Sequence, residues 1–177
     1  MERQVTQPSD GQRREDSAGA RSPAKDYADT TIRVRYAETD QMGVVYYGNY
    51  FTWFEIGRVE LCRALGFEYR QMEAEDDSFL VVAEAKCRYK RPARFDDLLT
   101  IRTRVTAAKK RTVSFGYEII HQGTDETIAT GETTHVICNS AGQTKSLPEK
   151  YRKFLPDSLA GENLSAKAHT PSGESQS

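Results

Sequence analysis

The chain has 177 residues, a formal net charge of −1 and a mean hydropathy of −0.69. This length is typical of one domain with its own buried core, and the balanced charge excludes a general attraction to nucleic acid or to an anionic membrane. No apolar run reaches the roughly 18 residues of a membrane helix, and residues 1–20 lack the apolar middle of a secretory signal, so we expect a soluble, cytoplasmic protein without a membrane span.

Polar residues concentrate at both ends of the chain. Residues 1–26 and 157–177 hold almost no apolar side chains to bury, so we expect two disordered tails around a single domain at 27–156. The three cysteines lie far apart in apolar or strand-like segments, which is typical of reduced core residues and not of a zinc site. We expect no metal and no cofactor.

The domain opens with a predicted strand. Ile32, Val34 and Tyr36 alternate with Arg33 and Arg35, and this is the period of a half-buried strand. We therefore expect the three apolar side chains to share one buried face.

After a loop at 38–47, the apolar residues change to a helical period. One helical face carries Tyr50, Phe54, Gly57, Leu61 and Leu65. The pattern predicts a long buried helix that ends near Gly66. Gly57 costs this helix about 1 kcal/mol relative to alanine, which indicates that another part of the chain approaches closely there. Glu55 and Arg58 are spaced i, i+3 and are expected to pair on the exposed side.

The second half of the domain has mostly strand character. A short helix is predicted at 69–75, and strands at 79–89, 98–107, 112–121 and 127–139. Pro92 stops the first of these strands, and turn-like segments separate the others. One strand, one buried helix and four more strands give an α+β order, with an antiparallel sheet curled around the long helix.

The segment Glu38–Glu55, which joins the first strand to the long helix, carries the chemistry. Asp40 is a carboxylate that lies a few residues before the helix, and the first backbone N–H groups of a helix are unpaired and favour negative charge. A carboxylate so placed can attack a carbonyl carbon or activate water, while the N–H groups stabilise the resulting oxyanion. The three histidines are not accompanied by a nucleophile elbow, so a catalytic triad is not expected.

The segment also has a recognisable motif. Its residues are Asp40, Gly43, Val44, Val45, Tyr46, Asn49, Tyr50, Glu55 and Arg58. On these residues, and on RYKRPARFDDLLTI at 88–101, the chain resembles the 4-hydroxybenzoyl-CoA thioesterase family of hotdog-fold proteins. The likeness is strongest to the branch of short acyl-CoA thioesterases that are encoded beside the Tol-Pal system, and it extends from about Thr31 to Leu155.

The resemblance implies a hotdog fold, in which a roughly five-stranded antiparallel sheet wraps a long central helix. It also implies hydrolysis of acyl-CoA with short-chain, branched or aromatic acyl groups, in homodimers or homotetramers whose active sites lie at the dimer interface. The resemblance further implies that Asp40, by its position in the motif, is the catalytic carboxylate, as nucleophile or as general base. It implies that the backbone N–H of Tyr47 polarises the thioester carbonyl.

Substrate contacts are expected from the motif segment and from a basic turn. The candidates in the segment are Gly43, Val45, Tyr46, Asn49 and Trp53. Lys109, Lys110 and Arg111 form the most concentrated basic turn of the domain and are candidates to bind the phosphates of CoA. Arg88, Lys90 and Arg91 form a second candidate cluster.

Three alternative functions stay open at this stage. The acyl group could be carried on acyl carrier protein, the substrate could be dihydroxynaphthoyl-CoA, or the chain could bind acyl-CoA without catalysis, because one fold can host unrelated functions. A panel of thioesters separates the first two from acyl-CoA hydrolysis in general, and the third releases no thiol from any of them.

Overall fold

The computed structural model describes residues 27–66 and 68–152, and the two predicted tails lie outside these ranges. In chain order the elements are β1 (Ala28–Arg33), a 3-10 turn η1 (Tyr36–Glu38), α1 (Asn49–Ala64), α2 (Tyr69–Asp76), β2 (Phe79–Tyr89), β3 (Leu98–Ala108), β4 (Thr112–His121), β5 (Thr127–Cys138) and α3 (Glu149–Arg152). None of the helices in these ranges has the length and apolar character needed to span a membrane.

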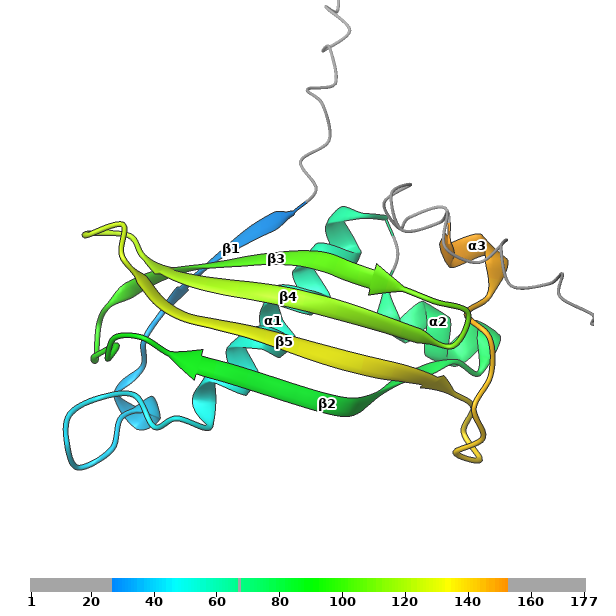
Figure 1. The fold of residues 1–177 in the computed structure, drawn as a ribbon, viewed down its shortest axis with the longest axis horizontal. Helices are drawn as coiled ribbons and strands as arrows, with labels where there is room; N and C mark the ends of the chain where they lie inside the picture. The colour runs from blue at the N-terminus through cyan, green and yellow to red at the C-terminus, as the bar shows by residue number, and fades with distance from the viewer. Residues whose placement is uncertain (1–26, 67, 153–177) are drawn as a thin grey trace, which may run out of the picture.

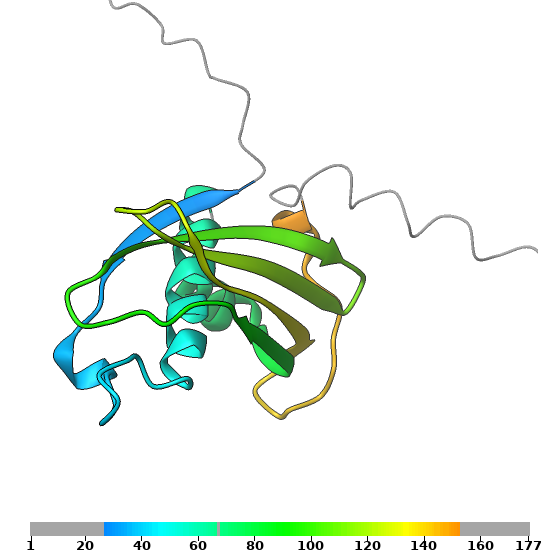
Figure 2. The ribbon, with the colours of Figure 1, turned by 60° about the vertical axis from the view of Figure 1, so that its left-hand side comes forward.

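The five strands form one antiparallel sheet in the order β1-β3-β4-β5-β2. Helix α1 lies behind this sheet in Figure 1, and Figure 2 shows the sheet arching over it. This is the α+β hotdog architecture that the sequence predicts, and the number of strands, their direction and the central position of the long helix are confirmed.

The core lies between α1 and the inner face of the sheet. Phe54 is completely buried and stacks on Tyr117 of β4, with 4.3 Å between ring centroids. A methyl group at Gly57 would lie 2.8 Å from Ile101 Cγ2 and would also meet the hydroxyl of Thr103, both on β3. The predicted close approach at Gly57 is therefore confirmed, and it is β3 that approaches.

The first strand begins and ends earlier in the chain than predicted. It ends at Arg33, and although Val34 is 1% exposed, Tyr36 opens η1 and is 77% exposed. The prediction that Tyr36 shares the buried face was wrong, because the carboxylate of Glu38 accepts a hydrogen bond of 2.8 Å from the backbone N–H of Arg35 and turns the chain out of the strand.

Arg58 also differs from its prediction. Glu55 is exposed, whereas Arg58 turns inward, with its guanidinium 5.9 Å from the ring centroid of Tyr69 and 6.0 Å from that of Phe115. No ion pair joins Glu55 to Arg58 in the described part of the chain. The predicted surface pair is wrong, because this side of α1 faces aromatic rings and not water.

Strand β2 is an edge of the sheet and is largely uncovered. It pairs with β5 on one side only, and Val81 and Val82 are 49% and 53% exposed. An edge strand leaves backbone N–H and C=O groups free to pair with another strand.

Candidate active site

The loop between η1 and α1 folds into a small hairpin with Asp40 at its tip. The backbone N–H of Asp40 donates to the carbonyl of Val44 at 2.9 Å, and the chain turns at Gly43, whose φ of +71° favours glycine. The carboxylate of Asp40 accepts a 2.8 Å hydrogen bond from the backbone N–H of Met42. In a single chain the Asp40 side chain is exposed, and this N–H is its hydrogen-bond partner.

The base of this hairpin is tied to the start of α1. Thr39 and Val45 form a β-bridge. The carbonyl of Glu38 accepts two further hydrogen bonds, from the backbone N–H of Tyr46 at 2.9 Å and from the side-chain amide of Asn49 at 2.8 Å. The hairpin therefore leaves the body of the protein at the N-terminus of α1.

This N-terminus presents free backbone donors. The residue before the helix is Gly48, which has no side chain to cap the first turn. Among the hydrogen bonds of the described residues, none is donated by the backbone N–H of Tyr47 or Gly48. The carbonyl of Tyr47 is held from the other side, by the hydroxyl of Tyr89 at 3.1 Å. These two N–H groups form the anion-favouring position that the sequence predicts at the helix start.

Exposed aromatic and apolar side chains surround the hairpin. Those that are at least 44% exposed are Tyr36, Met42, Tyr46, Tyr47, Tyr89 and Phe95. The ring centroids of Tyr46 and Tyr47 lie 4.4 Å apart. Tyr36 and Phe95 pack edge to face, with 5.7 Å between their ring centroids. A cluster of exposed apolar side chains is typical of a surface that a ligand or another subunit covers.

Glu38 is a site residue that the sequence analysis missed. It is 7% exposed, and its carboxylate accepts hydrogen bonds from the Arg35 guanidinium at 2.8 Å and from the indole of Trp53 at 3.2 Å. Burial raises the pKa of Glu38, but its hydrogen bonds with Arg35 and Trp53 outweigh burial, and the pKa lies below its ordinary value. The signal in the sequence was the spacing of Glu38 three residues after Arg35, as in a capping box.

The other predicted contact residues divide into open and covered ones. Tyr46 and Tyr47 are exposed next to the free N–H groups, and Gly43 is exposed at the tip of the hairpin. Val45 and Trp53 are 5% and 1% exposed, so within one chain they support the hairpin from below and offer no open surface to a ligand.

The two basic clusters lie at opposite ends of the sheet. Lys109, Lys110 and Arg111 form the turn from β3 to β4, and β3 runs 11 residues away from the hairpin end, about 33 Å at 3.3 Å per residue. Residues 88–91, by contrast, surround Tyr89, whose hydroxyl holds Tyr47. Within one chain the second cluster therefore lies at the hairpin end of the sheet, and Lys109–Arg111 lie at the opposite end.

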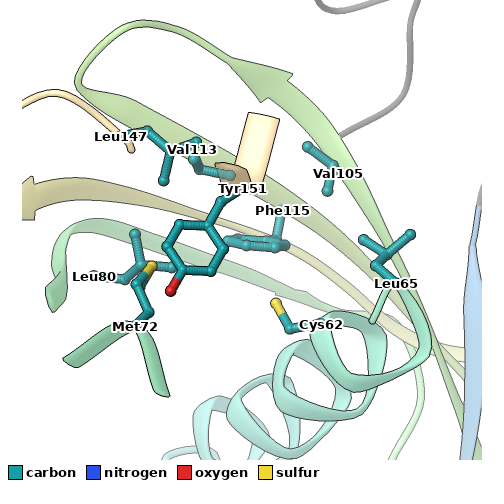
Figure 3. A pocket seen from close by; sticks show the side chains of 9 residues that line it. All are labelled: Cys62, Leu65, Met72, Leu80, Val105, Val113, Phe115, Leu147 and Tyr151. Carbon is teal, nitrogen blue, oxygen red and sulfur yellow. The ribbon is translucent and has the colours of Figure 1, made fainter. Parts of the chain in front are cut away.

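An apolar pocket lies near the C-terminal end of α1 (Figure 3). Its lining residues include Cys62 of α1, Leu65 directly after this helix, Met72 of α2, Phe115 of β4 and Tyr151 of α3. Its free volume is about 10 Å³, which is the space of a single water molecule. This pocket is a packing void remote from the hairpin, and it is too small for an acyl group.

Comparison with known proteins adds the family context. Residues 42–128 match the thioesterase superfamily. The acyl-CoA thioester hydrolase YbgC of Escherichia coli is 33% identical over 131 residues, which cover 74% of this chain and 91% of YbgC. The protein YneP of Bacillus subtilis is 36% identical over 126 residues, which cover 71% of this chain and 88% of YneP.

Solved structures agree with these relatives. A DHNA-CoA thioesterase of Staphylococcus aureus superposes with a TM-score of 0.68 at 31% identity, over 72% of this chain and 85% of that one. A 4-hydroxybenzoyl-CoA thioesterase superposes with a TM-score of 0.69 over 75% of this chain and all of that one, and its 17% identity makes this a likeness of fold.

Proposed function

This chain belongs to the thioesterase superfamily, and we propose that it hydrolyses acyl-CoA thioesters with Asp40 as the catalytic carboxylate. In this proposal the backbone N–H of Tyr47, and with it that of Gly48, binds the thioester oxygen. Glu38 and Trp53 lie beneath these groups and do not touch the substrate.

The observation that carries the proposal is the pair of free N–H groups at the start of α1, together with the exposed carboxylate of Asp40 on the hairpin that leaves the protein there. Neither Tyr47 nor Gly48 donates its backbone N–H within the described residues, and Gly48 supplies no capping side chain. An oxyanion in this position would accept both donors and would lie at the positive end of the helix dipole. The exposure of Asp40 in a single chain supports the proposal, because a substrate can reach its carboxylate.

Two routes use these groups, and both are balanced. As nucleophile, a carboxylate oxygen of Asp40 bonds to the carbonyl carbon while the C–S bond breaks, and the CoA thiolate takes a proton from water. Water then hydrolyses the anhydride, which releases the acid and restores Asp40. As general base, Asp40 takes a proton from water as the water oxygen attacks the carbonyl carbon. The C–S bond of the resulting intermediate then breaks, and the protonated Asp40 gives its proton to the leaving CoA thiolate, which releases the acid and restores the carboxylate. In both routes the N–H groups stabilise the charge that develops on the carbonyl oxygen.

Thiol release from a panel of thioesters tests the proposal. The panel contains short-chain, branched and aromatic acyl-CoA and one acyl carrier protein thioester. We expect the variant Asp40→Asn to lose roughly 10³-fold or more in kcat on every substrate that the wild type cleaves. Asp125→Asn is the matched control, because Asp125 is an exposed aspartate in the turn before β5 and no hydrogen bond or ion pair of the described residues joins it to the hairpin or to α1. Equal rates for wild type and Asp40→Asn on every thioester would refute the catalytic role.

A dihydroxynaphthoyl-CoA substrate is the second candidate. It is supported by the 31% identity to the DHNA-CoA thioesterase of Staphylococcus aureus and by a 27% identical 1,4-dihydroxy-2-naphthoyl-CoA hydrolase of Synechococcus elongatus. This substrate belongs in the same panel, and the order of kcat/KM across the panel decides between it and smaller acyl groups.

We also propose that the active form is a homodimer joined at β2. Val82 is 53% exposed on the inner face of this edge strand, and a second copy of the strand would pair with its free backbone groups. Light scattering should give twice the 20.0 kDa mass of the chain. Val82→Lys should give the monomer mass and lose activity, whereas a wild type of monomer mass with full activity contradicts the dimer.

The basic cluster at 88–91 is the better candidate to bind the phosphates of CoA. Arg88, Lys90 and Arg91 are exposed near Tyr89, at the hairpin end of the sheet, whereas Lys109–Arg111 lie at the other end. A charge reversal at Lys90 should raise the KM for acyl-CoA without changing the KM for a pantetheine thioester, which lacks the nucleotide phosphates. The same reversal at Lys110 serves as the matched control.

A further inference from the structure

Glu38 is a buried acid that the proposed chemistry does not use. It lies two residues before Asp40 and is 7% exposed, and burial of a carboxylate is unfavourable unless hydrogen bonds replace its water. Its side chain has three such bonds, from the backbone N–H of Arg35 at 2.8 Å, the Arg35 guanidinium at 2.8 Å and the indole of Trp53 at 3.2 Å. The side chain is therefore fixed between η1 and α1.

The main chain of Glu38 is equally engaged. Its carbonyl accepts the backbone N–H of Tyr46 at 2.9 Å and the side-chain amide of Asn49 at 2.8 Å. These two donors lie on either side of Tyr47, and the backbone N–H of Asn49 also donates to the carbonyl of Tyr46 at 3.0 Å. One residue thus holds the chain one residue before and two residues after Tyr47, whose N–H binds the thioester oxygen in the proposed function.

We propose that Glu38 is a positioning residue, which sets the carboxylate of Asp40 against the backbone N–H of Tyr47. The inference rests on the proposed thioesterase function and adds a residue to it. Glu38 joins the two halves of the site because it precedes Asp40 by two residues while its hydrogen bonds reach Trp53 and Asn49 on α1. We call the three side-chain and two carbonyl hydrogen bonds of Glu38 the clamp. Without the clamp the hairpin can rotate about its base, and a displacement of about 1 Å can cost 10²-fold in rate.

The charge of Glu38 is part of this function. All three groups that face its carboxylate are donors, and an ionised carboxylate accepts from all of them. A glutamine of the same size presents one oxygen and one NH₂ group, so at least one of the three donors faces another donor. Glu38→Gln therefore loosens the clamp without removing volume from the core.

The test compares kcat and KM of Glu38→Gln with those of the wild type. We expect kcat to fall roughly 10- to 100-fold, with a KM within about threefold of wild type. Glu55→Gln is the matched control, since Glu55 is an exposed glutamate on α1 and should keep wild-type kinetics. Trp53 is the only tryptophan in the chain, so its emission reports on the clamp itself and should change in Glu38→Gln but not in Glu55→Gln.

Two milder variants keep the inference testable where Glu38→Gln folds poorly. Trp53→Phe removes one donor to the carboxylate, and Asn49→Ala removes one donor to the carbonyl. Each should lower kcat by about 3- to 30-fold, and Trp53→Phe should have little further effect once Glu38 is glutamine, because both changes act on one contact.

The outcomes separate this inference from the proposed function. If Asp40→Asn abolishes activity while Glu38→Gln and both milder variants keep wild-type kcat, the positioning role is wrong and the thioesterase assignment stands. If Asp40→Asn is fully active, the proposed function fails first. A fall in kcat that only tracks a smaller folded fraction, with unchanged kcat per folded molecule, also overturns the positioning role.

Discussion

Replacing Gly57 by alanine places a methyl group between α1 and the middle of the sheet. The new carbon would lie 2.8 Å from Ile101 Cγ2 and would also contact the Thr103 hydroxyl. Both side chains come from β3, which pairs with β1 on one side and β4 on the other, so neither can move without disturbing the sheet. The helix itself would have to shift.

The magnitude follows from two opposing effects. Alanine stabilises a helix interior by about 1 kcal/mol relative to glycine. Overpacking of a filled core costs about 1–3 kcal/mol, and two contacts shorter than 3.0 Å place Gly57→Ala near the upper end. We expect the free energy of unfolding to fall by about 2 kcal/mol.

Urea denaturation of four proteins measures this effect and its cause. They are the wild type, Gly57→Ala, Thr103→Ala and the double variant. Thr103→Ala alone should cost little, because the buried Thr103 hydroxyl has no hydrogen-bond partner among the described residues. In the Thr103→Ala background, Gly57→Ala should cost at least about 1 kcal/mol less than in the wild type, because one of the two clashes is gone. Equal costs in both backgrounds, or a stabilising Gly57→Ala, would refute the reasoning.

Burial, followed by the positive charge of Arg58, lowers the pKa of His135 to about 4. An unfolded histidine binds its proton near 6.5, so the free energy of unfolding should fall by about 3 kcal/mol as the pH is lowered from 6.5 to 4, and His135→Gln should flatten this slope; an identical slope in both proteins would contradict the assignment. Burial raises the pKa of the Cys62 thiol to about 11, so iodoacetamide at pH 8 should leave Cys62 unlabelled in the native protein and label it in urea, as peptide mass spectrometry can verify. Gly43→Ala should lower kcat without unfolding the protein, because the φ of +71° at the hairpin tip is strained for alanine; wild-type kinetics would show that the tip tolerates another turn.

The sequence predicts the elements whose periodicity is local. The four strands from residue 79 onward begin and end within one residue of their predicted bounds, and the long helix buries its predicted apolar face. Each of these patterns repeats over ten residues or more. Helix α3 was not predicted, since its four residues after Pro148 are too few to form a periodic pattern.

Two of the errors arise where a side chain finds its partner on another element of the fold. Spacing alone made Arg58 a surface partner of Glu55, but the rings that receive it are Tyr69 and Phe115, on separate elements. Glu38 was missed because its partner Trp53 lies 15 residues later. The role of the basic turn at 109–111 in binding CoA stays a prediction: charge density indicated it, and the length of β3 places it far from the hairpin within one chain.

The most direct test of the thioesterase account is a crystal structure of the protein with a non-hydrolysable acyl-CoA analogue. The account predicts the carbonyl oxygen of the analogue within hydrogen-bond distance of the Tyr47 N–H, and a carboxylate oxygen of Asp40 about 3–3.5 Å from the carbonyl carbon. An analogue bound elsewhere, with the Asp40 carboxylate still turned to the N–H of Met42 and open to water, would contradict it.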